Sequence, residues 1–351
     1  MGHHIEALTF LGMRAIIASS PMHCLLETIK RAAPSNATIL IRGESGSGKE
    51  VVARALHHYS ARAAKPWVDL SCAALPEHLV ESELFGYEKG AFSGANNTKP
   101  GLFELAAEGT LFLDEVAELD AKLQVKLLRV LDGNPFYRLG GTKKIPVDIR
   151  LIAATNQDLE NAIRKGTFRN DLYHRLAQIE LHVPPLRTRT EDIVPIANMF
   201  MAQQNPNMRF DAEAERLLCN YSWPGNVREL RNVVVKCAVL VDSNIITGSD
   251  LPTDLQSAPA KNHSGNDLYR LNSALAGAMT ISPLASAAIS GGAILEGMEK
   301  QMILKALSDT GGHHQRAAEM LGISRRTLSR KIKSYVVGSL PETYPRHQES
   351  L

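Results

Sequence analysis

Short apolar runs alternate with segments of helical spacing along the first half of the chain, and this alternation restricts the possible folds most strongly. The apolar runs cover 37–43, 66–71, 109–116 and 147–156, and the helical patterns that follow them cover 50–62, 75–86, 119–133 and 158–166. Strands that are joined through helices pair in parallel. Runs without polar alternation are typical of strands that are buried on both faces. The sequence therefore predicts an α/β fold in which helices cover a parallel sheet.

The pattern changes after Pro184 and Pro185, beyond which only helical spacing remains. We expect a lead-in over 1–9, an α/β subdomain over 10–186, a purely helical subdomain over 187–251, a linker over 252–293, a helical module over 294–337 and a tail over 338–351. The linker is assigned because Ala, Ser and Gly dominate it. A helix over 21–33 is also expected near the N-terminus.

Composition limits the class of protein. The chain has 351 residues, which is enough for one large domain and one or two small ones. Its formal net charge is only +2, so a nucleic-acid-binding surface must show as a local cluster. The cysteines lack the spacing of a zinc site or a disulfide framework, which favours free thiols in a reducing compartment. Because no signal-peptide pattern is present, we expect a cytoplasmic protein.

Residues 271–295 carry no charge and exceed the roughly 20 residues that span a bilayer. A membrane span is therefore an alternative for this segment. Small residues and the central Pro283 dominate it, whereas insertion is favoured by continuous Leu, Ile, Val and Phe. We interpret it as linker and expect no membrane partner.

A glycine-rich sequence, GESGSGKE, joins the first predicted strand to the first predicted helix of the alternating region. It matches the phosphate-binding P-loop pattern and consists of Gly43, Glu44, Ser45, Gly46, Ser47, Gly48, Lys49 and Glu50. Glycines let backbone N–H groups surround phosphate oxygens, and Lys49 supplies the charge for the β- and γ-phosphates of ATP. Glu50 stands where a Ser or Thr magnesium ligand is usual, so Mg²⁺ must depend more on other groups.

Two adjacent carboxylates end the apolar strand of GTLFLDEV. Asp114 is placed to hold Mg²⁺, directly or through water, and Glu115 to polarise the water that attacks the γ-phosphate. Such a pair is ordinary by itself, but it follows a P-loop within an alternating α/β pattern. A P-loop with two carboxylates favours hydrolysis of ATP over phosphate transfer to a metabolite.

The segment GAFSGA, which consists of Gly90, Ala91, Phe92, Ser93, Gly94 and Ala95, has the composition of an exposed loop. Its one large apolar side chain, Phe92, is then held in water. An exposed aromatic side chain of this kind is a ready anchor on a partner. The alternative is that Phe92 folds back into the core of its own chain.

Six motifs in one order resemble those of the bacterial sigma-54-dependent transcription activators. They are GESGSGKE, SELFGYEKGAFSGA, GTLFLDEV, GTFRNDLYHRL, VPPLRTRTEDI and WPGNVREL. The resemblance covers about 10–251 for the ATPase and 294–337 for a C-terminal DNA-binding module. It implies an AAA+ ATPase that forms a ring, expected to be a hexamer, and remodels RNA polymerase carrying sigma-54. It also implies that GAFSGA corresponds to the family's GAFTGA loop, which contacts sigma-54, with Ser93 in place of a threonine.

The resemblance extends to further site residues. Arg169 and Arg175 resemble the arginine fingers that reach the nucleotide of a neighbouring subunit. Asn156 resembles the polar sensor of the γ-phosphate, and Arg228 the second sensor, which spans lid and nucleotide. Ser71 stands where many relatives have an asparagine that restrains the catalytic glutamate, so that coupling is expected to differ here.

The C-terminal module has helix-turn-helix spacing, with Ser324 as the N-cap of its second helix. It resembles the Fis-type module of the same family. The side chains expected to contact upstream double-stranded DNA are Arg325, Arg326, Thr327, Ser329, Arg330, Lys331 and Lys333. The early ones would face bases and the later cations phosphates. A solvated basic helix is the alternative.

Two functions from different classes remain open on the residues alone. The leading one is an ATP-driven activator of sigma-54 polymerase, and the other is a DNA-binding regulator whose ATPase fold serves as a nucleotide-gated assembly switch. Only Ser71 and Ser93 favour the second. Many relatives carry a receiver or sensor domain before the ATPase, and only a few tens of residues precede it here. We therefore expect a separate regulatory protein, control by expression level, or a sensor that the sequence does not reveal.

Overall fold

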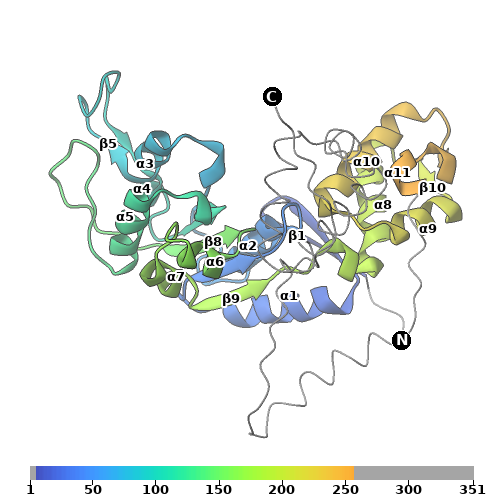
Figure 1. The fold of residues 1–351 in the computed structure, drawn as a ribbon, viewed down its shortest axis with the longest axis horizontal. Helices are drawn as coiled ribbons and strands as arrows, with labels where there is room; N and C mark the ends of the chain where they lie inside the picture. Colours follow the sequence, from blue (N-terminus) through green and yellow to red (C-terminus); the bar gives the residue numbers. More distant parts are fainter. Residues whose placement is uncertain (1–4, 257–351) are drawn as a thin grey trace, which may run out of the picture. The chain divides into compact units, whose positions relative to one another are not determined.

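The computed structural model describes residues 5–256, and its centre is a five-stranded parallel sheet in the order β4-β7-β8-β3-β9 (Figure 1). The strands are β3 Ile39–Arg42, β4 Trp67–Ser71, β7 Thr110–Asp114, β8 Arg150–Thr155 and β9 Ile179–His182. The predicted parallel α/β sheet is thus confirmed. Strand β9 was not predicted, because this edge strand mixes apolar with polar residues and is not a continuous apolar run.

Helices cover both faces of the sheet. They are α1 Ser20–Ala32, α2 Lys49–His58, α3 Glu77–Phe85, α4 Leu102–Leu105, α5 Ala121–Leu131, α6 Leu159–Arg164 and α7 Asn170–Leu176. Successive side chains of a strand point to opposite faces, and in β3 Leu40 joins one core while Ile39 and Ile41 join the other. The first core lies under α3, α5, α6 and α7, and the second under α1 and α2.

A helical lid follows β9 (Figure 1). Its helices are α8 Ile193–Gln204, α9 Ala212–Asn220, α10 Asn226–Leu240 and α11 Thr253–Gln256, and they enclose a third core around the fully buried Trp223. The expectation of purely helical structure is wrong in one detail, because β10 Arg209–Phe210 and β11 Ile245–Ile246 form a parallel pair. Strands of two residues are too short to produce a recognisable alternation.

The N-terminal segment is part of the fold rather than a simple lead-in. Strands β1 Glu6–Phe10 and β2 Met13–Ile17 form an antiparallel hairpin. Both residues of its turn, Leu11 and Gly12, have positive φ, as a tight two-residue hairpin requires. Phe10 is 2% exposed and packs in the second core. This hairpin was not predicted, because a leucine occupies one of the two turn positions, where glycine or asparagine is the usual signal.

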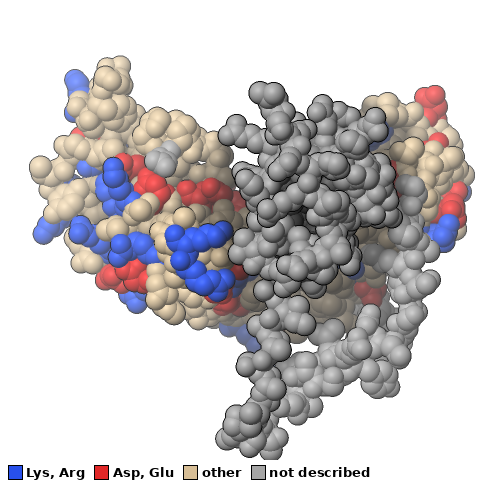
Figure 2. All heavy atoms as spheres, in the orientation of Figure 1, with Lys and Arg blue, Asp and Glu red and all other residues tan. Residues whose placement is uncertain are grey.

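A second hairpin projects from the α/β subdomain (Figure 1). Its paired residues are β5 Gly86–Tyr87 and β6 Lys99–Pro100, and GAFSGA lies in the loop between them. The space-filling view in Figure 2 shows that the end of this projection is mostly uncharged.

The expected linker begins with helical structure, since Thr253–Gln256 form α11 and Leu255 packs in the lid core. The remainder of that linker, the helical module over 294–337, the tail over 338–351 and the seven proposed DNA-contacting residues lie outside the described residues. Within 5–256, no helix is both long and apolar enough to cross a bilayer.

Candidate active site

The P-loop connects β3 to α2 and turns through two left-handed glycines. Gly46 has φ +74° and Gly48, directly before α2, has φ +105°. Nothing lies within 4 Å of the place where a Cβ on Gly48 would stand. This open space at the start of a helix, where free backbone N–H groups gather, fits an anionic phosphate group.

Lys49 is the first residue of α2 and is only 6% exposed. Its ammonium donates to the carbonyl oxygens of Gly43 and Glu44, at 3.1 and 3.4 Å, and lies 3.3 Å from Glu115 Oε1. The buried cation is thus held between the loop that would bind phosphate and the carboxylate that follows β7.

Two carboxylates, those of Asp114 and Glu115, stand next to each other where β7 ends. Burial, and then the neighbouring Glu115, raise the pKa of Asp114 above its ordinary value. A divalent cation would relieve the repulsion between two neighbouring carboxylates, so this pair fits Mg²⁺. Glu50 is turned to another partner, because its Oε1 accepts two hydrogen bonds from Arg54, at 2.9 and 2.7 Å.

Asn156 directly follows β8 and contacts Glu115 through its main chain. Its backbone N–H donates to Glu115 Oε2 at 3.0 Å. The side chain of Asn156 is expected from the resemblance to act as a sensor, whereas the contact described here is made by its backbone and fixes the orientation of the glutamate. Ser71 is the last residue of β4 and lies opposite Asp114 in the sheet. Asp114 directly precedes Glu115 in the sequence.

The lid touches the P-loop directly. The backbone N–H of Val227 donates to Gly46 O at 3.0 Å, and Arg228 donates to Ser45 Oγ at 2.7 Å. A Cβ on Gly46 would lie 2.5 Å from Gly225 O, so this position requires glycine for close approach as well as for its φ. The structure therefore brings Arg228 to the phosphate loop, as the resemblance implied.

Two further lid residues contact the P-loop and were not predicted from the sequence. Arg187 forms a bidentate ion pair with Glu44, and Asn226 donates to Glu44 Oε2 and to Ser45 O, both at 3.1 Å. These two partners lower the pKa of Glu44 to about 2. Asn226 is fully buried and has a positive φ, which marks a constrained turn in the structure. No sequence signal shows what that turn contacts.

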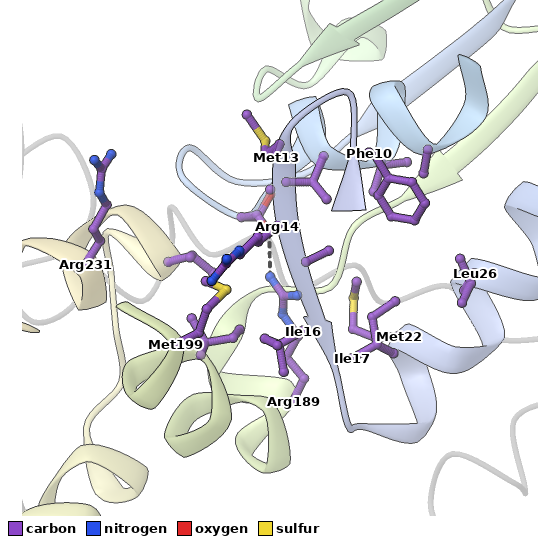
Figure 3. A pocket seen from close by; sticks show the side chains of 18 of the residues that line it. Phe10, Met13, Arg14, Ile16, Ile17, Met22, Leu26, Arg189, Met199 and Arg231 are labelled. Carbon is purple, nitrogen blue, oxygen red and sulfur yellow. Dashed lines mark hydrogen bonds between the residues drawn. The ribbon is translucent and has the colours of Figure 1, made fainter. Parts of the chain in front are cut away.

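A cavity of about 260 Å³ adjoins the P-loop, between the N-terminal hairpin, α1, α2 and the lid. Figure 3 shows Phe10, Met22 and Leu26 at one side of it, with Arg14 and Arg189 nearer the lid. Ser47 and Gly48 belong to its lining, so it opens to the phosphate loop. Its apolar walls fit a flat, weakly polar group of a ligand whose phosphates occupy the loop.

Arg169 and Arg175 lie apart from these groups, at the start of α7 and within it. Arg169 pairs with Asp171 on its own helix, at 3.0 and 2.7 Å. Arg175 donates to Leu131 O and lies 3.1 Å from Asp132, at the end of α5. Within residues 5–256, neither arginine contacts the P-loop of its own chain.

The GAFSGA loop is held at its base and exposed at its tip. Phe92 is 46% exposed, and its ring packs edge-on against Tyr87 with the centroids 5.0 Å apart. Phe92 is therefore neither free in water nor folded into the core. At the base of the loop, Arg138 donates to Glu88 and Glu104, which joins the hairpin to the segment before β8 and to α4.

Three family models match successive parts of the chain. They are the sigma-54 interaction domain over 15–182, an AAA+ ATPase lid domain over 187–268, and the Fis family of bacterial regulatory proteins over 294–335. The lid match extends beyond the end expected at 251.

Similar proteins share most of the length of this chain. The regulatory protein AtoC of Escherichia coli is 44% identical over 326 residues, which are 91% of this chain and 67% of AtoC. The transcriptional regulator NtrC of Proteus hauseri is 42% identical over 330 residues, covering 91% and 69%. A crystal structure of NtrX from Brucella abortus in complex with ADP superimposes with a TM-score of 0.65 and 37% identity, covering 92% of this chain and 69% of NtrX.

Fold, site and matches together define a Mg²⁺-dependent AAA+ ATPase with a helical lid. The chain belongs to the family of bacterial sigma-54-dependent transcription activators. It is a DNA-binding activator with a Fis-type helix-turn-helix, and its partners are DNA and the RNA polymerase that carries sigma-54. Remodelling of that polymerase by ATP hydrolysis is typical of the family.

Proposed function

We propose that Lys49, Asp114 and Glu115 carry out ATP hydrolysis. The observation that supports this best is the 3.3 Å contact between the Lys49 ammonium and Glu115, beside the open space at Gly48. Lys49 binds the β- and γ-phosphates, and Glu115 orients and polarises the attacking water, since Asn156 holds its other oxygen. Asp114 would hold Mg²⁺, which would neutralise charge on the phosphates.

The apolar cavity beside the loop takes the adenine of ATP. Its position next to Ser47 and Gly48 lets one ligand fill the cavity and the P-loop together. Arg228 reads the bound phosphates from the lid, and its present contact with Ser45 Oγ shows that the side chain is long enough to reach the loop. Nucleotide binding thereby fixes the angle between lid and sheet.

The active form is a ring, which we propose to be a hexamer, in which Arg169 and Arg175 enter the nucleotide site of the next subunit. The ion pairs that hold them are 42–48% exposed, so exchanging them for phosphate contacts costs little. Supplying a cation from a neighbour stabilises the charge of the transition state and makes hydrolysis depend on assembly. The protein would act in the cytoplasm. DNA binding, through Arg325 and its neighbours, would concentrate the subunits near promoters.

Phe92 and the residues around it contact sigma-54. The half-exposed ring, supported by Tyr87 and by the Arg138 contacts at the loop base, is an apolar anchor on a positioned arm. Ser93 keeps the hydroxyl of the family's threonine and lacks its methyl group.

A complex with purified sigma-54, in Mg²⁺, ADP and aluminium fluoride to imitate the hydrolysis transition state, tests this function. We expect a complex that requires the analogue and is lost with Phe92→Ala. Normal ATP hydrolysis without any such complex would favour the alternative, a nucleotide-gated assembly switch.

A further inference from the structure

Three segments that are far apart in sequence meet in one buried polar cluster beside the P-loop. The β2–α1 junction contributes Ser19, the P-loop contributes Ser47, and the start of the lid contributes Arg189 and Asp192. Each of the four residues is at most 3% exposed. Because removing a guanidinium and a carboxylate from water is costly, these two charged groups depend on the hydrogen bonds that they make inside the cluster.

Asp192 fixes the lid to the beginning of α1. Its Oδ1 accepts hydrogen bonds from the backbone N–H groups of Ala18 and Ser19, at 2.7 and 2.8 Å, and its Oδ2 accepts one from Ser19 Oγ at 2.8 Å. Arg189 Nη1 lies 3.9 Å from Asp192 Oδ2. The carboxylate of Asp192 thus accepts its hydrogen bonds from the residues before α1. Its contact with Arg189 is longer, and Arg189 forms its hydrogen bond with another group.

That partner is the P-loop main chain. Arg189 Nη2 donates to the carbonyl oxygen of Ser47, the contact drawn as a dashed line in Figure 3. The C=O of one residue and the N–H of the next point in opposite directions across a trans peptide. With Ser47 O turned toward Arg189, the N–H of Gly48 is turned to the other side of the peptide plane.

We propose that Arg189 is a positioning residue for nucleotide binding, which orients the 47–48 peptide so that Gly48 N–H faces the phosphates. Gly48 can hold this orientation because its φ of +105° suits glycine. The inference rests on the proposed placement of the phosphates at the P-loop. Since Arg189 belongs to the lid segment, the same hydrogen bond makes the shape of the loop depend on the position of the lid.

Three ligands measured on the full chain test the proposal. ADP uses loop and cavity, pyrophosphate uses only the loop, and adenosine uses only the cavity. We expect Arg189→Gln to weaken ADP and pyrophosphate binding by the same factor, about tenfold, as for loss of one charge-assisted hydrogen bond, with adenosine changed less than about twofold. Arg189→Lys keeps the charge with a single nitrogen and should recover part of the loss.

The control is Arg14→Gln, because Arg14 lines the same cavity but is exposed and contacts no P-loop carbonyl among the described residues. It should leave the ratio of ADP to adenosine affinity unchanged. Retained adenosine binding shows that an Arg189 variant is folded, and if Arg189→Gln does not fold, the partial loss in Arg189→Lys decides.

Equal weakening of adenosine and ADP, or unchanged pyrophosphate binding, would overturn the proposal, because Arg189 would then act only as a wall of the cavity. Lys49→Ala tests the proposed phosphate site separately. If pyrophosphate bound equally well to wild type and Lys49→Ala, the placement of the phosphates would be wrong, whatever Arg189 does.

Discussion

Glu44 of the P-loop and Arg187 of the lid segment form a bidentate ion pair, with N–O distances of 2.6 and 2.8 Å, across 143 positions of sequence. This pair lies outside the third core that holds the lid helices together, so it joins the lid to the loop without stabilising the lid itself. Its partners are both 42% exposed, which limits its contribution to stability.

A double-mutant cycle of Glu44→Gln and Arg187→Gln should therefore give a modest coupling, roughly 0.5–1 kcal/mol, in the free energy of unfolding. The pKa of Glu44 is lowered to about 2, so this contribution is present above the carboxyl's unfolded pKa and is lost as the pH falls toward 2. Urea unfolding at pH 7 and pH 3 measures both effects.

The matched control is the exposed pair Glu213 and Arg216 within α9. Substitutions in that pair should leave the affinity for ADP unchanged. Because Glu44 joins the P-loop to the lid, we also expect Glu44→Gln to change the affinity for ADP. An unchanged affinity would argue against a link between lid and nucleotide.

Replacing Glu115 by Gln should reduce the rate of ATP hydrolysis at least about 100-fold, because the amide cannot polarise the attacking water. ADP and ATP affinity should stay within a few fold, since Lys49 keeps its two loop carbonyls as partners. Steady-state hydrolysis and calorimetric binding measure the two quantities. Glu118→Gln, three residues away and bonded to Gln157, is the control and should hydrolyse ATP nearly normally. A Glu115→Gln chain with normal turnover would remove this residue from the chemistry.

Substituting Phe92 with Ala should leave ATP hydrolysis within about twofold of wild type and abolish activation of a sigma-54 promoter. The ring packs edge-on against Tyr87 and belongs to none of the three cores of the described residues, so its loss has little effect on stability. Hydrolysis and in vitro transcription are measured on the same preparation. Leu105→Ala removes a similarly exposed apolar side chain, 51% exposed, that lies outside the loop, and should activate normally. Activation by the Phe92 variant would rule out the proposed anchor.

Stability should fall as the pH drops below about 6.5, in part through His57. This residue is 1% exposed, its Nδ1 lies 2.9 Å from Thr110 Oγ1, and burial lowers its pKa, with Arg150 and His58 adding repulsion. The folded chain therefore resists a proton that the unfolded chain accepts below 6.5, which costs up to about 1.4 kcal/mol per pH unit.

His57→Gln keeps a partner for Thr110 and should flatten this dependence between pH 7 and 5. Urea midpoints across that range measure it, with the exposed His174→Gln as control. Equal slopes in wild type and His57→Gln would assign the acid sensitivity to other groups.

The positions of the candidate site residues in the fold were predictable from the sequence where neighbouring residues determine them. The P-loop spacing places Lys49 at the start of α2, and the apolar run of β7 places Asp114 and Glu115 at its end. What links the site to the lid was not predictable, because Arg187, Arg189 and Asn226 contact residues that lie 140 or more positions earlier. No local period encodes such a contact, and an arginine near Pro185 looks the same whether it faces water or a buried carbonyl.

The lid helices were predictable from their spacing, whereas the N-terminal hairpin was not. Its strands have five residues each, and Leu11 adopts a positive φ that sequence signals reserve for glycine or asparagine. The partial exposure of Phe92 also depends on one contact, with Tyr87, that composition alone does not reveal.

The N-terminal hairpin also connects the cavity beside the P-loop to the start of the described chain. Phe10, Ala15 and Ile17 form a wall of the cavity, and Asp192 fastens the residues just after β2 to the lid. A pull or a twist applied to the backbone ahead of Glu6 would therefore be delivered, within one short strand, to the wall against which a base would rest.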